Sequence, residues 1–428
     1  MMTKWRVPRI FILLLLTVDQ PISVLSQSEG TPVLTLEALI QEALMKNPQL
    51  LAARQKAAAA SRQIPQARAW DAPSLGVEFY NTPINTFDVL SKGMETDYFL
   101  QQMLPFPGKL SAMGSMAAFN TKIAEAGVQA VERKIIADVK SAYYELYFNQ
   151  KKSEINAENR DLVQKMADIA NQQFAVGMGS QQDVLKAQVE LSKLINEGRI
   201  LEQEKKVIVA MLNTLLSRPP ETPMPAVPEI EPIGDEFSSE RLQQMALENR
   251  PELKAMSYNV EMSRAGKSLA RREYYPDLMV KLTYKRMPFA EMDAWAAMFQ
   301  VNLPIAFWSG GKYRNRVQET ELTISQSEEE YRAMANMTRF EVTQALTQLQ
   351  TSRGTLQLYK SSLIPQAEQT LRSTLTAYQT GKVDFLSLID SYRMLTMTRL
   401  DYYMAVMQCL KSQAELERVV GVALSQVK

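Results

Sequence analysis

Two very long stretches without turn residues dominate the pattern of apolar and polar positions in this sequence. The range 311–381 contains a single internal proline and is rich in Glu, Gln, Arg, Leu and Ala, which predicts one long helix. The range 108–177 has nearly the same length. At about 1.5 Å per residue each predicted rod would reach roughly 100 Å, about three times the hydrocarbon thickness of a bilayer. No compact domain needs a helix of that length.

Shorter elements surround each rod in the same order. A short helix, at 35–70 or 238–275, comes first; two strand-like segments follow, and a return helix, at 181–217 or 384–422, comes after the rod. Pro48 and Pro65 predict that the first short helix is bent or broken. Apolar residues spaced seven positions apart predict coiled-coil packing. In the return helix at 181–217 they are Leu194, Leu201, Ile208 and Leu215, and in the second rod they are Val342, Leu349, Leu356 and Leu363.

The strand-like segments alternate between apolar and polar side chains. In the third segment Leu278, Val280, Leu282 and Tyr284 alternate with Met279, Lys281, Thr283 and Lys285. This predicts a strand with one apolar and one charged face. Segments of about ten residues with aromatic ends match a membrane-spanning strand, although a half-buried sheet in a soluble protein would show the same alternation.

Four strands per chain are too few to seal a pore. An open four-stranded sheet in lipid would leave unpaired edges, each backbone group costing several kcal/mol. Two copies would give eight strands with a filled interior, and three would give twelve, wide enough for a lumen. A spanning duct therefore requires at least three copies.

The two halves of the chain are related by an internal duplication at an offset near 203 residues. Gly108-Lys109 falls opposite Gly311-Lys312, and Gly177 opposite Gly381 at an offset of 204. Prolines crowd the range 219–232, which indicates an extended connector. We therefore expect a first repeat at 27–218, a linker at 219–237 and a second repeat at 238–428.

The N-terminus indicates export. Lys4, Arg6 and Arg9 precede an apolar run at 10–18 and the small-residue pattern at 24–26, which predicts a signal peptide at 1–26. No later run is long and apolar enough for a transmembrane helix, so contact with a membrane would be made through strands. The lone Cys409 excludes an intrachain disulfide, and no cysteine near the cleavage region could carry an N-terminal lipid.

Several kinds of chemistry are missing. The chain has no His and a formal net charge of +1, which excludes histidine-based triads and gives no electrostatic case for nucleic acid. The range 309–313 lacks the spacing of a phosphate loop. Met394, Met397, Met404 and Met407 could present thioethers to a soft metal ion, but such stripes are usually core filler. We expect no enzyme activity, cofactor or metal site.

These features together resemble the outer-membrane efflux protein family, the TolC-like channel tunnels, over essentially the whole mature chain. The segment 102–109, Gln-Met-Leu-Pro-Phe-Pro-Gly-Lys, is most similar to the heavy-metal branch, the CusC- and CzcC-like channels. The resemblance implies a homotrimer in the outer membrane of a Gram-negative bacterium. Its 12-stranded transmembrane β-barrel would continue as a helical barrel across the periplasm and dock onto an adaptor (membrane fusion) protein and an inner-membrane pump of the resistance-nodulation-division type.

The resemblance also implies roles for individual residues. The rod ends Val176, Gly177, Gly381 and Lys382 would meet the adaptor. Asp390 would ring the aperture, with Ser387 in place of a second carboxylate. Asp183 and Tyr378 match a pair that latches neighbouring helices, but Val383 stands at the usual basic position.

Proline and glycine residues mark the expected turns from sheet to rod. Pro105 and Gly108, like Pro304 and Gly311, bracket the change from sheet to rod, because Pro ends a ladder and Gly absorbs the change of direction.

The leading function is a passive exit duct for metal cations or small toxic compounds. A type I protein-secretion duct would use the same architecture, and a periplasmic coiled-coil scaffold with a soluble sheet is a further alternative.

Overall fold

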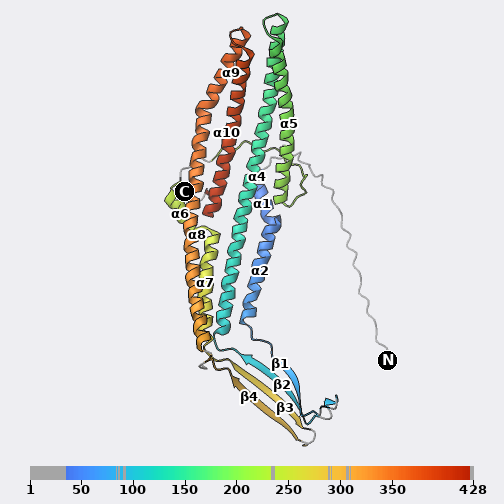
Figure 1. The fold of residues 1–428 in the computed structure, drawn as a ribbon, viewed down its shortest axis with the longest axis vertical. Coiled ribbons are helices and arrows are strands. Elements are labelled where there is room, and N and C mark those ends of the chain that lie inside the picture. Colours follow the sequence, from blue (N-terminus) through green and yellow to red (C-terminus); the bar gives the residue numbers. More distant parts are fainter. Residues whose placement is uncertain are drawn as a thin grey trace, which may run out of the picture.

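The protein was analysed as a computed structural model that describes residues 35–424 apart from 83, 85–86, 90–92, 233–236, 288–289, 291, 305–307 and 309. The expected signal peptide at 1–26 lies outside the described residues. The described chain is mainly helical with four antiparallel strands, which confirms the expected secondary-structure class. The molecule is elongated, with the sheet at one end and two helical hairpins at the other (Figure 1).

The first half begins with two short helices. Its elements are α1 (Leu36–Lys46), α2 (Pro48–Arg68), β1 (Ser74–Tyr80), β2 (Glu95–Leu104), α4 (Lys109–Ala175) and α5 (Gln181–Leu215). The helix breaks at Asn47, which is extended because Pro48 follows it. The Asn47 side chain caps α2 by accepting the backbone N–H groups of Gln49 and Leu50. Pro65 lies inside α2 without ending it.

The second half carries its elements in a similar order. They are α6 (Ser239–Asn249), α7 (Pro251–Arg272), β3 (Leu278–Met287), β4 (Met292–Val301), α8 (Gly310–Leu358), the π-helical turn η1 (Tyr359–Leu363), α9 (Ile364–Gln379) and α10 (Phe385–Val420). The second rod is thus α8, η1 and α9 in succession. Pro365 has no N–H to donate, and the chain widens to a π turn just before it, where Ile364 donates to the Tyr359 carbonyl.

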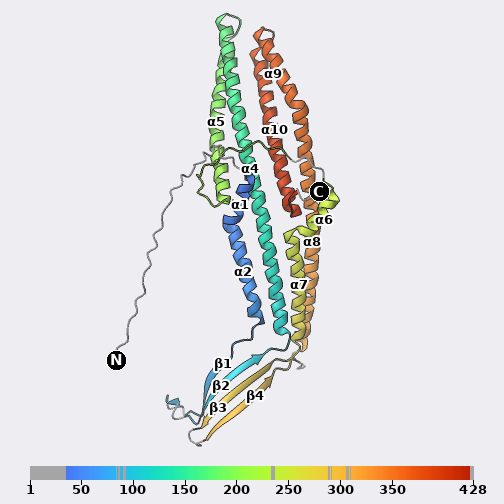
Figure 2. The same ribbon diagram turned by 180° about the vertical axis from the view of Figure 1, so that it is seen from behind.

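The long helix α4 is the element to which most of the others attach. It contacts α1, α2, α5, α7 and α10, and Figures 1 and 2 show α2 and α5 along successive parts of it. Three buried apolar clusters lie along the helical part. One surrounds Tyr147 at mid-length, one surrounds Phe385 near the hairpin ends, and one surrounds Leu349 between α6, α8 and α10.

The sheet is a simple antiparallel meander in the order β1-β2-β3-β4. Within the described residues β1 and β4 are therefore its two unpaired edges. None of the helices described is sufficiently long and apolar to pass through a membrane.

Candidate functional site

The sheet has one apolar face that is open to the surroundings. Its register aligns Val77, Tyr98, Tyr284 and Trp295 in one row and Leu75, Leu100, Leu282 and Ala297 in the next. Leu75 is 82% exposed, Trp295 78% and Phe299 69%. An apolar surface of this extent indicates contact with an apolar medium or another protein.

The other face of the sheet carries charges that are paired. Lys281 Nζ lies 3.2 Å from a Glu78 carboxylate oxygen and 3.8 Å from the centroid of the Phe99 ring. Lys285 binds Glu95 and lies 3.3 Å from Asp97 Oδ2. The predicted charged face of the third segment is therefore present, and its charges are neutralised by acids from the first half of the chain.

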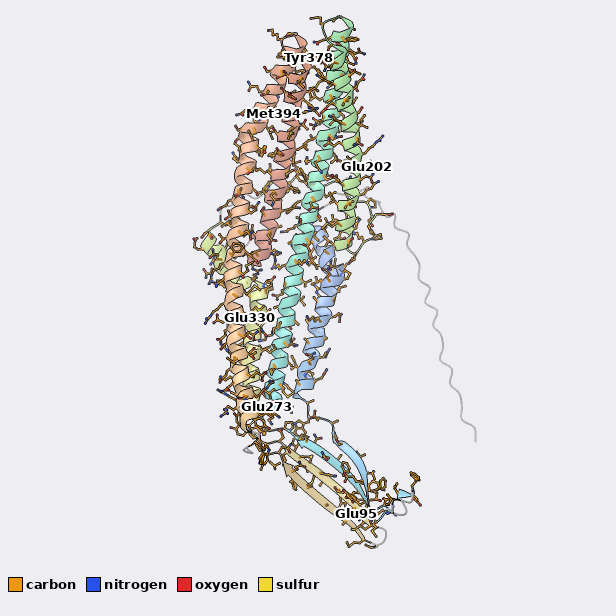
Figure 3. The ribbon with its side chains drawn as sticks, in the orientation of Figure 1. Glu95, Glu202, Glu273, Glu330, Tyr378 and Met394 are labelled. Atoms are coloured by element: carbon orange, nitrogen blue, oxygen red, sulfur yellow. The ribbon has the colours of Figure 1, made fainter. Side chains whose placement is uncertain are left out.

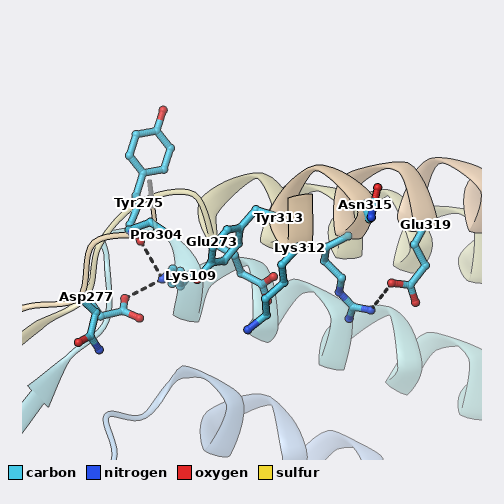
Figure 4. Close-up of a pocket in the computed structure, with 11 residues that line it drawn as sticks. Lys109, Glu273, Tyr275, Asp277, Pro304, Lys312, Tyr313, Asn315 and Glu319 are labelled. Carbon is cyan, nitrogen blue, oxygen red and sulfur yellow. Dashed lines mark hydrogen bonds and ion pairs between the residues drawn. The ribbon is translucent and has the colours of Figure 1, made fainter. Parts of the chain in front are cut away.

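The junction between sheet and rods is held by contacts between the two halves (Figure 4). Lys109 Nζ donates to Asp277 Oδ1 at 2.8 Å and to the Tyr275 carbonyl at 3.1 Å. The Phe106 N–H donates to the same Asp277 oxygen at 2.7 Å, and the Phe106 ring stacks on Tyr275 at 4.4 Å. A cleft of about 720 Å³ lies beside this joint and also borders Pro304 and Lys312.

The four residues expected at the sheet-to-rod turns are placed differently from one another. Pro105 directly follows β2, and Gly108 caps α4 with a left-handed φ of +91°. Pro304 lies in the connection after β4. Gly311 is the second residue of α8 and not part of the turn.

The first hairpin tip, residues 176–180, is a tight helix-ending turn. Gly177 has φ +75°, and the Met178 N–H donates to the Gln173 carbonyl at 2.9 Å. Ser180 then caps α5 by accepting the Asp183 N–H at 3.2 Å. Val176 is 69% exposed, so the tip presents an apolar side chain to its surroundings.

The second tip, residues 380–384, repeats this geometry. Gly381 has φ +71°, and the Lys382 N–H donates to the Ala377 carbonyl at 2.9 Å. Asp384 caps α10 by accepting the N–H and the hydroxyl of Ser387. Here the exposed side chain is the cationic Lys382.

Tyr378 lies close to the end of the second hairpin (Figure 3) and is only 3% exposed. Its ring packs edge-on against Phe385 at 5.4 Å. Burial and the nearby Asp183 carboxylate raise the pKa of Tyr378 to about 12. Its hydroxyl has no hydrogen-bond partner among the described residues. The structure therefore brings Tyr378 and Asp183 into electrostatic contact without a direct bond, while Asp390 is exposed on α10.

Two contacts between the hairpins were not anticipated from the sequence. Gln173 Nε2 donates to the Tyr378 carbonyl at 3.1 Å, and Arg393 on α10 forms a two-pronged pair with Glu190 on α5. The hydrogen bonds from Arg393 lower the pKa of Glu190. The opposite charges of Glu190 and Arg393 are visible in the sequence, but no local pattern pairs them.

No group of metal-ligating carboxylates or cysteines occurs within the described ranges. Met394 and Met397 are 54% and 64% exposed on α10, so these two thioethers are not core filler.

The chain matches one family model and several known proteins. Residues 39–215 and 242–422 match the family model described as "Outer membrane efflux protein". The cobalt-zinc-cadmium resistance protein CzcC of Cupriavidus metallidurans is 24% identical over 92% of this chain and 91% of its own length. A nodulation protein T of Rhizobium leguminosarum bv. trifolii is 20% identical over 71% and 68%.

Solved structures share the fold. The structure of CusC matches with a TM-score of 0.78 and 18% identity, over 91% of this chain and 92% of that one. VceC from Vibrio cholerae matches with a TM-score of 0.74 and 18% identity, over 91% and 96%.

Proposed function

The chain belongs to the outer membrane efflux protein family, whose members are transport channels and not enzymes, and from this premise we propose that three copies form one exit duct. The two-faced sheet is the observation that carries the proposal. Its exposed apolar face suits lipid, its charged face suits a wet lumen, and its edge strands β1 and β4 have opposite directions, so that copies could pair in a closed ring. Three sheets would make a barrel of twelve strands.

The proposal includes an internal duplication, with repeats at 27–218 and 238–428 joined by the linker 219–237. The similar order of elements in the two halves supports it. Each repeat would then supply two strands and one helical hairpin to the duct. The signal peptide at 1–26 would direct the chain to the outer membrane, with the helices extending into the periplasm.

The hairpin tips would form the inner end of the duct. Val176, Gly177, Gly381 and Lys382 would meet a periplasmic adaptor protein, which joins the duct to an inner-membrane pump of the resistance-nodulation-division type. Their exposure supports this role. Asp390, Asp183 and Tyr378 would form the aperture, with the Asp390 carboxylates of three copies facing one another.

The cargo we propose is metal cations, because a relative that covers most of the chain is named for cobalt, zinc and cadmium resistance. The duct would conduct such ions without a resident metal site, since tight binding would slow their passage.

Gene deletion tests this function. The deletion strain should become more sensitive to cobalt, zinc, cadmium, copper or silver, and the intact gene should restore growth. Dyes and antibiotics serve as the comparison set. Sensitivity to dyes alone would contradict the metal cargo, and unchanged sensitivity together with lost secretion of a protein would favour a secretion duct.

A further inference from the structure

In the first half of the chain a lysine holds the joint between sheet and rod, and the second half has a matching lysine without an ion-pair partner among the described residues. Lys109 is the first residue of α4, and it clamps the segment that leads into β3 through Asp277 and the Tyr275 carbonyl. The side chain of Lys109 is only 12% exposed as a result. This joint therefore fixes the second half of the sheet to the rod of the first half.

Lys312 stands 203 positions later and is the third residue of α8. Figure 4 shows it beside the cleft with no bond drawn to it, whereas Lys109 is bonded to Asp277. Arg316, which also lines the cleft, pairs with Glu319 at 2.8 Å. No carboxylate of the described residues forms an ion pair with Lys312, and its Nζ lies 5.5 Å from the centroid of the Tyr313 ring. Lys312 therefore resembles Lys109 in position along its rod, but within the described chain it binds no segment that leads into a strand.

The missing segment has a counterpart at the other edge of the same chain. Residues 69–73 lead from α2 into β1 as residues 273–277 lead from α7 into β3. At the offset of 203, Pro73 falls opposite Pro276 and Ser74 opposite Asp277, and Asp71, three positions before Ser74, is the one carboxylate of residues 69–73. Trp70 is 64% exposed, and Asp71 is also exposed. The backbone carbonyl of Asp71 accepts a hydrogen bond from Gln102 Nε2 at 3.0 Å. In the part of the chain that is described, the Asp71 carboxylate has no ion-pair partner.

Strand pairing would bring these two places together between copies. Within one chain the end of β2 pairs with the start of β3, with Leu104 opposite Leu278, so that Lys109 reaches the segment before β3. The same pairing of the β4 edge with the β1 edge of a second copy would lay that copy's 69–73 segment beside Lys312. The Asp71 carboxylate, three positions before the counterpart of Asp277, and the backbone carbonyls of this segment would then be available to the ammonium group.

We propose that Lys312 of one copy clamps the 69–73 segment of the next copy, with Asp71 as its acidic partner. The inference rests on the proposed trimer and on the proposed duplication. The partner is a second copy of this chain, because the segment that matches the one clamped by Lys109 occurs on this chain's own opposite edge.

Thiol cross-linking tests the contact. A variant with Asp71→Cys and Lys312→Cys, in a Cys409→Ala background, should give bands of two and three chains on denaturing gels after treatment with a short thiol-reactive cross-linker. The matched control, Lys109→Cys with Asp277→Cys, should cross-link within one chain and give no such ladder. Each single-cysteine variant should also give none.

The outcomes separate this inference from the proposed function. A trimer in detergent, shown by light scattering, without a ladder for the 71/312 pair would overturn the inference and leave the duct standing. A monomer would overturn both. As a second test, Asp71→Lys and Lys312→Asp should each lower the temperature at which the trimer dissociates, and the double reversal should restore it; additive losses would contradict the contact.

Discussion

Individual residues set the shape and charge of the hairpin tips. Gly177 and Gly381 both adopt left-handed φ values, and a Cβ at either position would meet no atom within 4 Å. Glycine is therefore favoured at both positions because of the backbone conformation, and not because a side chain would lack space. Asp390 is different, because its proposed role depends on charge and on the presence of two further copies.

We expect Gly177→Ala to strain the first tip by roughly 1–2 kcal/mol, because the left-handed conformation is unfavourable for an L side chain. That energy corresponds to about a 5–30-fold change in a local opening equilibrium. Amide hydrogen exchange at 174–180 should accelerate accordingly. Gly127→Ala is the matched control, since Gly127 lies within α4 and also has open space around its Cβ position. It should not accelerate exchange, and equal effects from both variants would contradict this account.

Asp390→Ala should raise the conductance of the purified trimer in planar bilayers. Three carboxylates at a narrow ring repel one another and hold counter-ions, and removing them should raise conductance. Asp161→Ala, which removes an exposed carboxylate from α4, is the control and should leave conductance unchanged. An unchanged value for Asp390→Ala would remove this residue from the aperture.

At the scale of elements, the proline-rich connector between the halves is fastened to α4. Val227 is 3% exposed, and its N–H and carbonyl both bond the Gln150 side chain. Glu229 accepts from Tyr147 and pairs with Lys151 at 2.7 Å. Burial alone would raise the pKa of Glu229, but its bonds from Lys151 and Tyr147 outweigh this and lower it. The connector is therefore a bound strap and not a loose tether.

Glu229→Gln should release this strap and speed its cleavage by protease at neutral pH. In the native chain the lowered pKa means that the stabilisation from Glu229 is present above its ordinary pKa and is lost as pH falls through the lowered value. Cleavage within 219–232 should thus rise on acidification in the native chain and respond less in the variant. Glu221→Gln, on the exposed part of the same connector, should behave as the native chain does. Identical profiles for all three proteins would refute the strap.

At the scale of the whole molecule, the sheet and the helical hairpins lie at opposite ends of the rods (Figure 1). The open apolar face of the sheet lies at one of these ends. A membrane contact there would leave the hairpin tips on the order of 100 Å away, from the length of the 67-residue α4. The duct proposal depends on this separation.

Two adjacent alanines test which face of the sheet meets lipid. Ala297 aligns with Leu282 on the apolar face, and Ala296 aligns with Thr283 on the charged face. Ala297→Lys should cost about 2–4 kcal/mol if that face lies in the bilayer, and the fraction of heat-modifiable barrel on gels should fall. Ala296→Lys should have a much smaller effect. Equal effects, or extraction of the native protein without detergent, would contradict a membrane barrel.

Much of this architecture could be predicted from the sequence because its signals are local. The alternation of apolar and polar residues predicted the two faces of β3 and β4, and the long stretches without turn residues predicted the rods. The helix stops at Gly177 and Gly381 were likewise visible, because a left-handed residue is needed where each helix ends. Even the break before α2 was foreseen at Pro48.

Only the tertiary structure decided the contacts between segments about 200 residues apart, because local periodicity does not encode which surfaces meet. The bond from Gln173 to Tyr378 and the Arg393–Glu190 pair belong to this class. The π-helical turn η1 is a further example. Under the proposed duplication the offset grows from 203 at Gly311 to 204 at Gly381, and η1, whose i to i+5 bonds accommodate one extra residue while the rod continues, would absorb that residue.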